Sequence, residues 1–370
     1  MNRTIGIDLG TTNTVGAIEG AALASAAEGG AILPSVVAFP PSGATLVGAP
    51  AKKRRAIDPK NTIFSAKRLM GKSWHSYNAT AFRKQYPFEL IATSGGQCAF
   101  KTRAGAYTPS DIAAYVVGKL LSMHRVDPMQ TDAVIAVPAS FDETARQATV
   151  DAAQKAGLRQ VSTVAEPVAT AVAYLEQGRQ RYNRVVVYDF GGGTFDLAIL
   201  DVSTHPARVI AHGGDPYLGG DDIDRALADW AAVRALEHYG WDLRSEAETS
   251  DRLTLQCERA KIRLGLAPQT RIELSQIDPG APAAAEAVSL DRETMKRVSD
   301  PFVARTFLIC DQVLRDAGVA TSDVDAVLLA GGTTLMPTVR EAVSRYFGAP
   351  AHAEFDPLEV VSIGASRLRA

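Results

Sequence analysis

The sequence predicts an α/β protein with two similar lobes, each built on a mixed β-sheet that is covered by helices. Three observations lead to this prediction. A strand–turn–strand pattern occurs twice, the two copies lie about half a chain length apart, and strand patterns alternate with helical patterns after each copy. With 370 residues, of which 46% are hydrophobic and 22% charged, the chain is long enough to bury more than one core.

The duplicated pattern reads as a hairpin. Its first copy pairs a strand over residues 4–9 with a strand over 13–18, and its second copy pairs 185–190 with 195–200. In both copies the first strand ends in an aspartate that is followed by an apolar residue and a glycine. This shared signature indicates an internal duplication.

Each half then supplies a strand followed by a helix. Residues 133–138 have the pattern of a buried strand and precede a helix predicted over about 143–156. Residues 326–330 likewise precede a helix over about 337–347. Strands that alternate with helices predict mixed sheets with helices packed on their faces.

Two insertions interrupt the predicted cores and are interpreted as peripheral subdomains that cap a cleft. The expected boundaries are lobe I over 1–183 (core 1–37 and 109–183, inserted subdomain 38–108) and lobe II over 184–370 (core 184–219 and 297–370, inserted subdomain 220–296). The first insertion is rich in Gly and Pro and carries a basic run at 52–55, which we interpret as a solvated helix face. The second insertion has a helical and charged pattern.

The net charge and the cysteines exclude several classes of function. A net charge of -2 provides no global positive field for nucleic acid or an anionic membrane, so neither partner is expected. The three cysteines, Cys98, Cys257 and Cys310, match no metal-ligand spacing and are expected to be small buried residues. The first residues lead directly into a strand pattern without an apolar signal core, and no apolar span has membrane length, which predicts a cytoplasmic location.

Two turns of small residues follow the duplicated strands and are candidate phosphate-binding elements. They are Gly-Thr-Thr-Asn at 10–13 and Gly-Gly-Gly-Thr at 191–194, and such turns let backbone N–H groups approach phosphates closely. The strand before each turn ends in a carboxylate, Asp8 or Asp189, suited to hold Mg²⁺, mostly through water. A third small-residue turn at 330–334 is expected on the opposite wall. The sequence has no Walker-type Gly-Lys-Ser/Thr element, which excludes a P-loop.

From end to end the chain resembles the ATPase domain of DnaK-type seventy-kilodalton heat-shock chaperones. The segments that carry the resemblance are 5–13, 67–71, 136–141, 166–167, 188–196, 218–222, 258–261, 331–332 and 363–365. The resemblance implies the actin-like ATPase fold, in which two lobes with RNase H-like mixed-sheet cores and inserted subdomains close on a nucleotide. It also implies ATP or ADP and Mg²⁺ as cofactors, with K⁺ as a further candidate ion.

The resemblance also assigns roles to individual residues. The implied catalytic residues are Lys67, Glu166, Asp189, Thr194 and Asp196. An ammonium placed where negative charge develops, together with carboxylates that order Mg²⁺ and water, is what phosphoryl transfer requires. The implied nucleotide-binding residues are Gly10, Thr11, Thr12, Asn13, Gly191, Gly192, Gly193, Thr194, Gly219, Gly220, Glu258, Lys261, Ile262, Gly265, Gly331, Gly332, Thr333, Leu335 and Leu358.

The base-binding wall departs from the family pattern. Leu335 stands where many relatives have an arginine that stacks on adenine, Gly265 where they have a hydroxyl, and Leu358 where they have an acidic residue. Losing a stacking cation and a polar contact removes on the order of 1 kcal/mol each. We therefore expect weaker or less selective adenine binding, with the base held between Ile262 and Leu335.

The surface that receives the interdomain linker and the J-domain partner in this family also departs. The departing residues are Ser162, Ala165 and Val168, which replace an arginine, an asparagine and a threonine. The family's switch pair, Pro138 and Arg146, is retained. The chain shows no peptide-binding domain after its last family motif, and whether the natural protein has one stays open.

Three functions compete at this point. The first is a slow ATPase whose nucleotide state switches lobe closure in a divergent chaperone, with a client polypeptide, a J-domain co-chaperone and a nucleotide exchange factor as candidate partners. The second is a nucleotide-sensing module that recruits a partner protein with little hydrolysis. The third, a small-molecule kinase or a filament-forming actin relative, is disfavoured because no acceptor pocket with a carboxylate base is recognisable and because filament formers lack the Lys67 segment.

Overall fold

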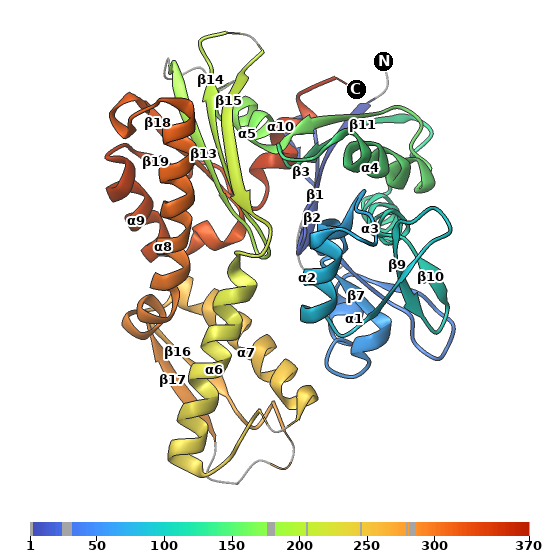
Figure 1. The fold of residues 1–370 in the computed structure, drawn as a ribbon, viewed down its shortest axis with the longest axis vertical. Helices are drawn as coiled ribbons and strands as arrows, with labels where there is room; N and C mark the ends of the chain where they lie inside the picture. Colours follow the sequence, from blue (N-terminus) through green and yellow to red (C-terminus); the bar gives the residue numbers. More distant parts are fainter. Residues whose placement is uncertain are drawn as a thin grey trace.

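The computed structural model describes residues 3–23, 32–175, 182–204, 206–244, 246–278, 280 and 286–369. These residues form two lobes, seen side by side in Figure 1, each centred on its own sheet. Within the described residues no helix is both long enough and apolar enough to span a membrane.

The N-terminal sheet has the order β12-β11-β1-β2-β3, with β4 also paired to β2. Its strands are β1 (Arg3–Leu9), β2 (Asn13–Ile18), β3 (Ala21–Ala22), β4 (Ile32–Pro34), β11 (Thr131–Val137) and β12 (Val161–Ala165). Strands β1 and β2 form the predicted antiparallel hairpin, and β1, β11 and β12 run parallel.

The C-terminal sheet repeats this arrangement in the order β19-β18-β13-β14-β15. Its strands are β13 (Arg184–Phe190), β14 (Phe195–Asp201), β15 (Arg208–Asp215), β18 (Ala326–Ala330) and β19 (Ala351–His352). Again a hairpin, β13–β14, pairs through its first strand with a parallel strand, β18, which pairs in parallel with the next, β19. Even the register corresponds, because Asp8 lies opposite Ala136 and Asp189 opposite Ala330. The predicted repeat of the hairpin and its parallel neighbour is therefore confirmed.

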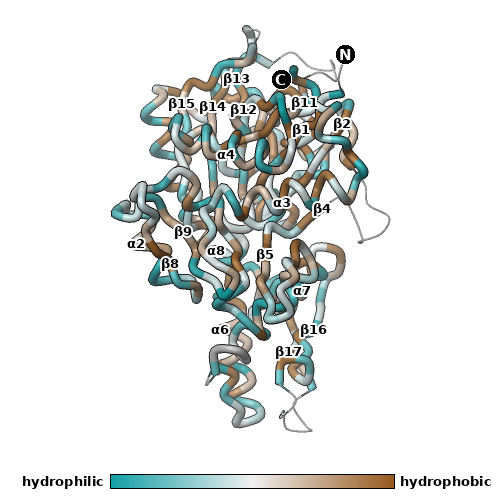
Figure 2. The backbone as a smooth tube through the Cα atoms, turned by 90° about the vertical axis from the view of Figure 1, so that its right-hand side faces the viewer, coloured by the Kyte–Doolittle hydropathy of each residue, from teal (hydrophilic) through white to brown (hydrophobic). Residues whose placement is uncertain are grey.

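Helices cover both sheets, and some of them, including α3, begin at a side-chain cap. Helix α3 (Pro109–Met123) begins with a capping box between Thr108 and Asp111 and has proline in its first turn. The predicted strand-to-helix units are confirmed by α4 (Glu143–Lys155) after β11 and by α9 (Pro337–Phe347) after β18. Helix α8 (Arg292–Ala317) packs on β14 and β15. Figure 2 shows hydrophobic residues along the central strands and hydrophilic residues over much of the outer tube.

Two helices join the lobes at the level of the two sheets. Helix α5 (Glu166–Leu175) contacts strands of both sheets, and α10 (Val360–Ser366) packs against α5, β1 and β11. Backbones come together there, since a Cβ on Gly364 would lie 1.7 Å from the Ala169 carbonyl oxygen. The chain's last helix thus lies on the N-terminal sheet, which the assignment of residues 297–370 to lobe II did not anticipate.

Both insertions contain more strand than the sequence indicated. The N-terminal insertion contains β5 (Val36–Ala38), β6 (Leu46–Val47), β7 (Thr62–Phe64), β8 (Glu89–Ala92), β9 (Cys98–Thr102), β10 (Gly105–Tyr107), α1 (Ala49–Lys52), α2 (Tyr77–Gln85) and two 3-10 turns, Pro59–Asn61 and Ala66–Leu69. The C-terminal insertion contains α6 (Gly220–Tyr239), α7 (Ala247–Leu266) and the hairpin β16 (Gln269–Glu273) and β17 (Ala287–Asp291). All three cysteines are buried, as expected.

Candidate functional site

A cleft with a volume of about 400 Å³ is lined by residues of both lobes, and most of the predicted site residues take part. Those residues are Asp8, Gly10, Thr11, Thr12, Asn13, Lys67, Glu166, Asp189, Gly191, Gly192, Gly193, Thr194, Glu258, Lys261, Ile262, Gly331, Gly332, Thr333, Leu335 and Leu358. Four predicted residues lie outside its lining, namely Asp196, Gly219, Gly220 and Gly265. Residues from both ends of the chain are thus brought to one cavity.

The first phosphate turn, residues 10–13, connects β1 to β2 and is fixed within its own lobe. A Cβ on Gly10 would lie 2.2 Å from the Asn13 carbonyl oxygen, so only glycine fits there. The Ser35 hydroxyl donates to the Gly10 carbonyl at 2.8 Å, and the Ser35 amide donates to the Thr12 carbonyl at 2.9 Å. The Thr12 Oγ1 atom is buried without a hydrogen-bond partner.

The second phosphate turn, residues 191–194, connects β13 to β14 and rests on the start of α6. The amides of Gly220 and Asp221 donate to the carbonyls of Gly191 (3.0 Å) and Gly192 (2.7 Å). A Cβ on Gly219 would lie 2.3 Å from the Gly192 carbonyl oxygen, so this approach requires glycine. Gly219 and Gly220 therefore support the turn from behind, which explains why these two predicted residues do not line the cleft.

The third turn follows β18 and lies against the end of β13. Gly331 has a φ of +80°, and a Cβ there would lie 2.5 Å from Asp189 Oδ1. The Thr333 hydroxyl donates to the Gly191 carbonyl at 2.8 Å. The third turn thus packs against both the second turn and the Asp189 carboxylate, and it forms part of the same wall.

Lys67 and Glu166 form an ion pair in the cleft. Their Nζ and Oε1 atoms lie 2.6 Å apart, and the side chains are only 11% and 10% exposed. Glu166 is the first residue of α5, and Lys67 lies on the 3-10 turn after Ser65, which has a φ of +56°. Burial lowers the pKa of Lys67, but the carboxylates of Glu166 and Asp8 outweigh burial and raise it, so the side chain is an ammonium.

Carboxylates outnumber ammonium groups around Lys67. Burial raises the pKa of Asp8 to about 7, with Lys67 opposing the rise and Glu166 adding to it. Burial and Glu166 raise the pKa of Asp196 to about 7 and the pKa of Asp189 well above its ordinary value. Asp196, although absent from the cleft lining, lines a small adjoining hollow with Asp189 and Glu166. A cation would relieve this crowding of negative charge.

A second charged cluster lines another part of the cleft. The Lys261 ammonium lies 2.8 Å from the Asp224 carboxylate and 3.0 Å from the Gly220 carbonyl. The second carboxylate oxygen of Asp224, Oδ1, is buried without a partner. Glu258 pairs with Lys52 at 2.7 Å. Burial raises the pKa of this glutamate, but Lys52, Lys261 and Arg55 together lower the pKa below its ordinary value, so the group is a carboxylate.

The position of Lys52 corrects the interpretation of the basic run at 52–55 as a solvated helix face. Lys52 reaches across to Glu258 and lines the cleft, and the Arg55 guanidinium lies 3.8 Å from the centre of the Phe64 ring. The interpretation was wrong because the sequence of a short basic run does not show which carboxylate of the other lobe lies next to it in the folded protein. Only Lys53 of this run is exposed.

The predicted base-binding wall is apolar and open. Ile262 and Leu335, which are 60% and 39% exposed, line the cleft together with Pro357 and Leu358. Gly265 faces open space, because a Cβ placed on it would have nothing within 4 Å. The predicted placement of Ile262 and Leu335 on one cavity agrees with the structure, whereas Gly265 lies away from the lining.

The other residues that depart from the family pattern lie on or near β12. Ser162 and Ala165 are half-buried on β12, and Val168 packs beside strand residues of the C-terminal sheet. Arg146 of the retained switch pair donates from Nε to the Phe141 carbonyl at 3.2 Å, in the loop that follows Pro138.

The cleft fits a nucleoside triphosphate with a divalent cation. In each of the three turns at least one glycine has a neighbour so close that a Cβ would not fit, as at Gly10, Gly192 and Gly331, which leaves backbone groups to contact phosphates. Two buried oxygens, Thr12 Oγ1 and Asp224 Oδ1, have no protein partner, and phosphate and ribose hydroxyl groups are suitable partners for them. In the described part of the chain, no three His, Cys, Asp or Glu side chains form a ready-made metal site, so a cation would depend on water and phosphate oxygens as well.

Three charged residues of the lining were not predicted from the sequence, namely Lys52, Asp221 and Asp224. Asp221 and Asp224 lie three residues apart at the start of α6, a spacing that places both on one helix face. That spacing, directly after the Gly219-Gly220 motif, was a usable signal. Lys52 gave none, because its partner Glu258 lies in the other insertion.

Comparison with known protein families agrees with this geometry. The model of the family described as Hsp70 protein matches residues 4–369, nearly the whole chain. Two lobes with the same strand order, which share a cleft lined by glycine turns, agree with the predicted actin-like ATPase fold. The chain therefore belongs to the Hsp70 family and forms a nucleotide-binding domain of the chaperone type.

Proposed function

We propose that this protein hydrolyses ATP slowly with Mg²⁺ and that its nucleotide state switches the closure of the two lobes. The observation that carries the proposal is the cleft itself, where phosphate turns from both lobes meet a buried Lys67–Glu166 ion pair. Contacts from both lobes to one triphosphate favour the closed arrangement, and the loss of the terminal phosphate removes part of them.

The two turns would hold the phosphates through backbone N–H groups. In the second turn the first residues of α6 bind the carbonyls of Gly191 and Gly192. Because the C=O and N–H of a trans peptide point in opposite directions, the N–H groups of the next residues point away from α6. Thr12 Oγ1 is available in the first turn as a further hydrogen-bonding group. Asp8 and Asp189 would hold Mg²⁺ through water, and the ion would supply charge neutralisation for the phosphate oxygens.

Lys67 is the residue on which hydrolysis should depend most. Its ammonium is fixed by Glu166 and surrounded by Asp8 and Asp196, so it is charged and has little freedom to move. Phosphoryl transfer passes through a loose transition state, in which stabilising developing charge and orienting water supply most of the catalysis. Glu166, Asp196 and Thr194 would orient the attacking water.

The test is single-turnover hydrolysis of Mg-ATP by the wild type and by Lys67→Ala. Lys72→Ala is the matched control, because Lys72 lies nearby in sequence but pairs with Asp142 outside the cleft, at 3.3 Å. We expect slow cleavage by the wild type and the control, and a loss of about 100-fold or more in Lys67→Ala. Equal rates in all three proteins would contradict the assigned role of Lys67.

We also propose that the apolar base wall reduces selectivity for adenine. Ile262, Leu335 and Leu358 can contact either purine through dispersion but offer no hydrogen bond to distinguish them. Competition binding should therefore show ATP and GTP within about tenfold of each other in Kd. Tight binding of adenosine nucleotides alone would refute this part of the proposal.

A nucleotide sensor with little hydrolysis is the second candidate, and the altered base wall favours it. In that case Mg-ATP would close the lobes and recruit a partner protein without cleavage. A client polypeptide, a J-domain co-chaperone and an exchange factor stay as candidate partners, with the replaced residues Ser162, Ala165 and Val168 weakening the expectation for the J-domain. Tight ATP binding without cleavage in the single-turnover assay would favour the sensor.

A further inference from the structure

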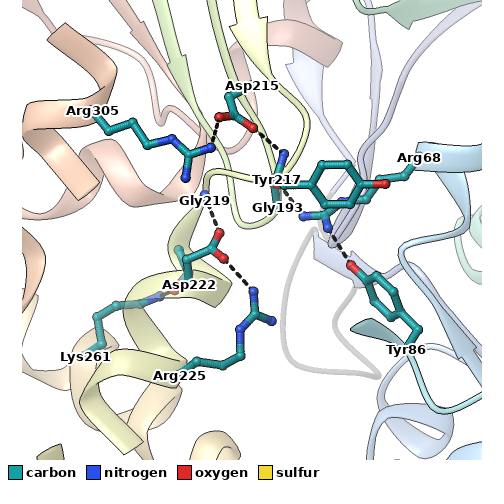
Figure 3. Close-up of polar contacts among 11 residues, drawn as sticks. Arg68, Tyr86, Gly193, Asp215, Tyr217, Gly219, Asp222, Arg225, Lys261 and Arg305 are labelled. Atoms are coloured by element: carbon teal, nitrogen blue, oxygen red, sulfur yellow. Dashed lines mark hydrogen bonds and ion pairs between the residues drawn. The ribbon is translucent and has the colours of Figure 1, made fainter. Parts of the chain in front are cut away.

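The three glycine carbonyls of the second phosphate turn are each bound by a donor, but the donors come from different lobes. Gly191 and Gly192 accept hydrogen bonds from the amides that begin α6, in the same lobe. The Gly193 carbonyl instead accepts one from the Arg68 guanidinium, which belongs to the N-terminal insertion (Figure 3). Only this last carbonyl of the three therefore depends on how the lobes are placed relative to each other.

Arg68 is held firmly in this position. It is 7% exposed, and its Nη1 atom donates to the Tyr86 hydroxyl at 2.6 Å within its own lobe. The guanidinium carbon lies 4.8 Å from the centre of the Tyr217 ring in the other lobe, a cation–π arrangement (Figure 3). A buried planar guanidinium that binds one group on each lobe is suited to bridging them.

Tyr217 reinforces the same bridge from the C-terminal lobe. Its hydroxyl donates to the Asn78 carbonyl of α2 at 3.1 Å, and its amide donates to Asp215 at 2.8 Å. Asp215 in turn pairs with Arg305 of α8, as Figure 3 shows. The loop that presents Tyr217 is thus anchored to its own lobe on one side and contacts the N-terminal insertion on the other.

The Gly193 carbonyl matters because of the peptide unit to which it belongs. In a trans peptide the C=O of one residue and the N–H of the next point in opposite directions. Binding the Gly193 carbonyl therefore fixes the direction of the Thr194 N–H, and Thr194 lines the nucleotide cleft. A Cβ on Gly193 would lie 2.9 Å from the Arg68 Nη2, so glycine allows the guanidinium to approach.

We propose that Arg68 is a positioning residue that makes the alignment of the Thr194 peptide depend on lobe closure. Arg68 does not line the cleft itself and acts through the Gly193–Thr194 peptide. When the lobes separate, Arg68 leaves the turn and the peptide is free to rotate, so hydrolysis is restricted to the closed arrangement. The link to hydrolysis rests on the proposed function, whereas the bridge between the lobes does not.

The experiment combines a distance measurement with kinetics. Spin labels on Ile57→Cys and Leu266→Cys report the separation of the two insertions, since these residues are 63% and 91% exposed and the native cysteines are buried. The test variants are Arg68→Met, which keeps the aliphatic stem, and Arg68→Lys, which keeps the charge. Arg225→Met is the matched control, because Arg225 lies in the same cluster but pairs with Asp222 inside its own lobe.

We expect Arg68→Met to broaden the inter-label distance distribution, both without and with Mg-ATP, while Arg225→Met leaves it as in the wild type. The single-turnover rate of Arg68→Met should fall about tenfold, with the Kd for ATP changed less than about threefold, because alignment rather than binding is lost. Arg68→Lys should recover part of both effects. Tyr217→Leu, which removes the aromatic side of the bridge without altering the turn, should broaden the distances as well.

Two results would overturn the inference separately from the proposed function. If Arg68→Met and Tyr217→Leu match Arg225→Met in their distance distributions, Arg68 does not bridge the lobes. If the distances broaden but the single-turnover rate stays at the wild-type value, the bridge exists and the positioning role is wrong. A wild type that never cleaves ATP contradicts the proposed function and the positioning role, whereas the bridge is still decided by the distances.

Discussion

The two phosphate turns occupy equivalent places in two lobes of the same strand order, yet they are held differently. Ser35, a neighbour in the same lobe, binds two carbonyls of the first turn. The second turn is bound by α6 of its own lobe and by Arg68 of the other lobe. The two lobes thus share the same hairpin, but the first turn is held by a core residue of its own lobe, whereas the second turn is held by residues of both insertions, one of which belongs to the other lobe.

The largest effect is expected from Gly10→Ala in the first turn. The new Cβ would lie 2.2 Å from a backbone oxygen that cannot move without breaking the hairpin. We expect a loss of about 2 to 4 kcal/mol in the free energy of unfolding and a loss of ATP binding by about 100-fold. Chemical denaturation and calorimetric titration measure the two quantities.

Gly193→Ala is the corresponding substitution in the second turn, and it should separate the loss of stability from the loss of lobe closure. There the new Cβ meets the ends of two side chains, Arg68 and Thr11, at 2.9 Å, and displacing a side-chain end costs less than displacing the backbone oxygen beside Gly10. Stability should fall by only about 1 kcal/mol, while the lobes should close less completely. A loss of stability equal to that of Gly10→Ala would show that the two turns are held alike and would break the comparison.

Ser35→Ala tests the support of the first turn without adding an atom. The hydroxyl donates to the Gly10 carbonyl and contacts the buried Thr14 hydroxyl at 2.9 Å. Its removal should cost about 1 to 2 kcal/mol of unfolding free energy, as expected when a buried polar group loses its partner. The inter-label distance should stay as in the wild type, because both ends of this contact lie in one lobe.

The smallest effect concerns the pH dependence of ribose binding. Burial raises the pKa of Asp224 to about 7, although Lys261 opposes the rise. A ribose hydroxyl that donates to Asp224 favours the ionised carboxylate, so affinity for ATP should increase as the pH rises from about 6 to about 8, by about tenfold at most. The same titration with 2′,3′-dideoxy-ATP or with Asp224→Asn should lack this component. If all three titrations have the same pH dependence, the ribose hydroxyls do not contact Asp224.

The sequence predicted the parts of the site that lie within continuous segments. The hairpins around Asp8 and Asp189 were recognisable because strand periodicity and glycine turns are local signals, and the register of the two sheets bears this out. Contacts between segments were not recognisable. Neither the Lys52–Glu258 pair nor the Arg68–Gly193 contact leaves a pattern in either segment, because each depends on how the lobes come together.

Gly219 and Gly220 show a second kind of limit. The family resemblance placed them among the nucleotide-binding residues, and the structure shows them packed against the second turn and outside the cleft lining. Sequence motifs identify positions where the backbone must approach something closely, but they do not tell whether that is a ligand or another segment of the protein.

The most direct test of the central claim is a crystal structure of the protein with Mg²⁺ and a non-hydrolysable ATP analogue. We predict that the triphosphate lies between residues 10–13 and 191–194, with the ribose at Asp224 and Lys261 and the base beside Ile262 and Leu335. A nucleotide that contacts only one of the two turns, or that binds outside this cleft, would contradict the joint role of the two lobes.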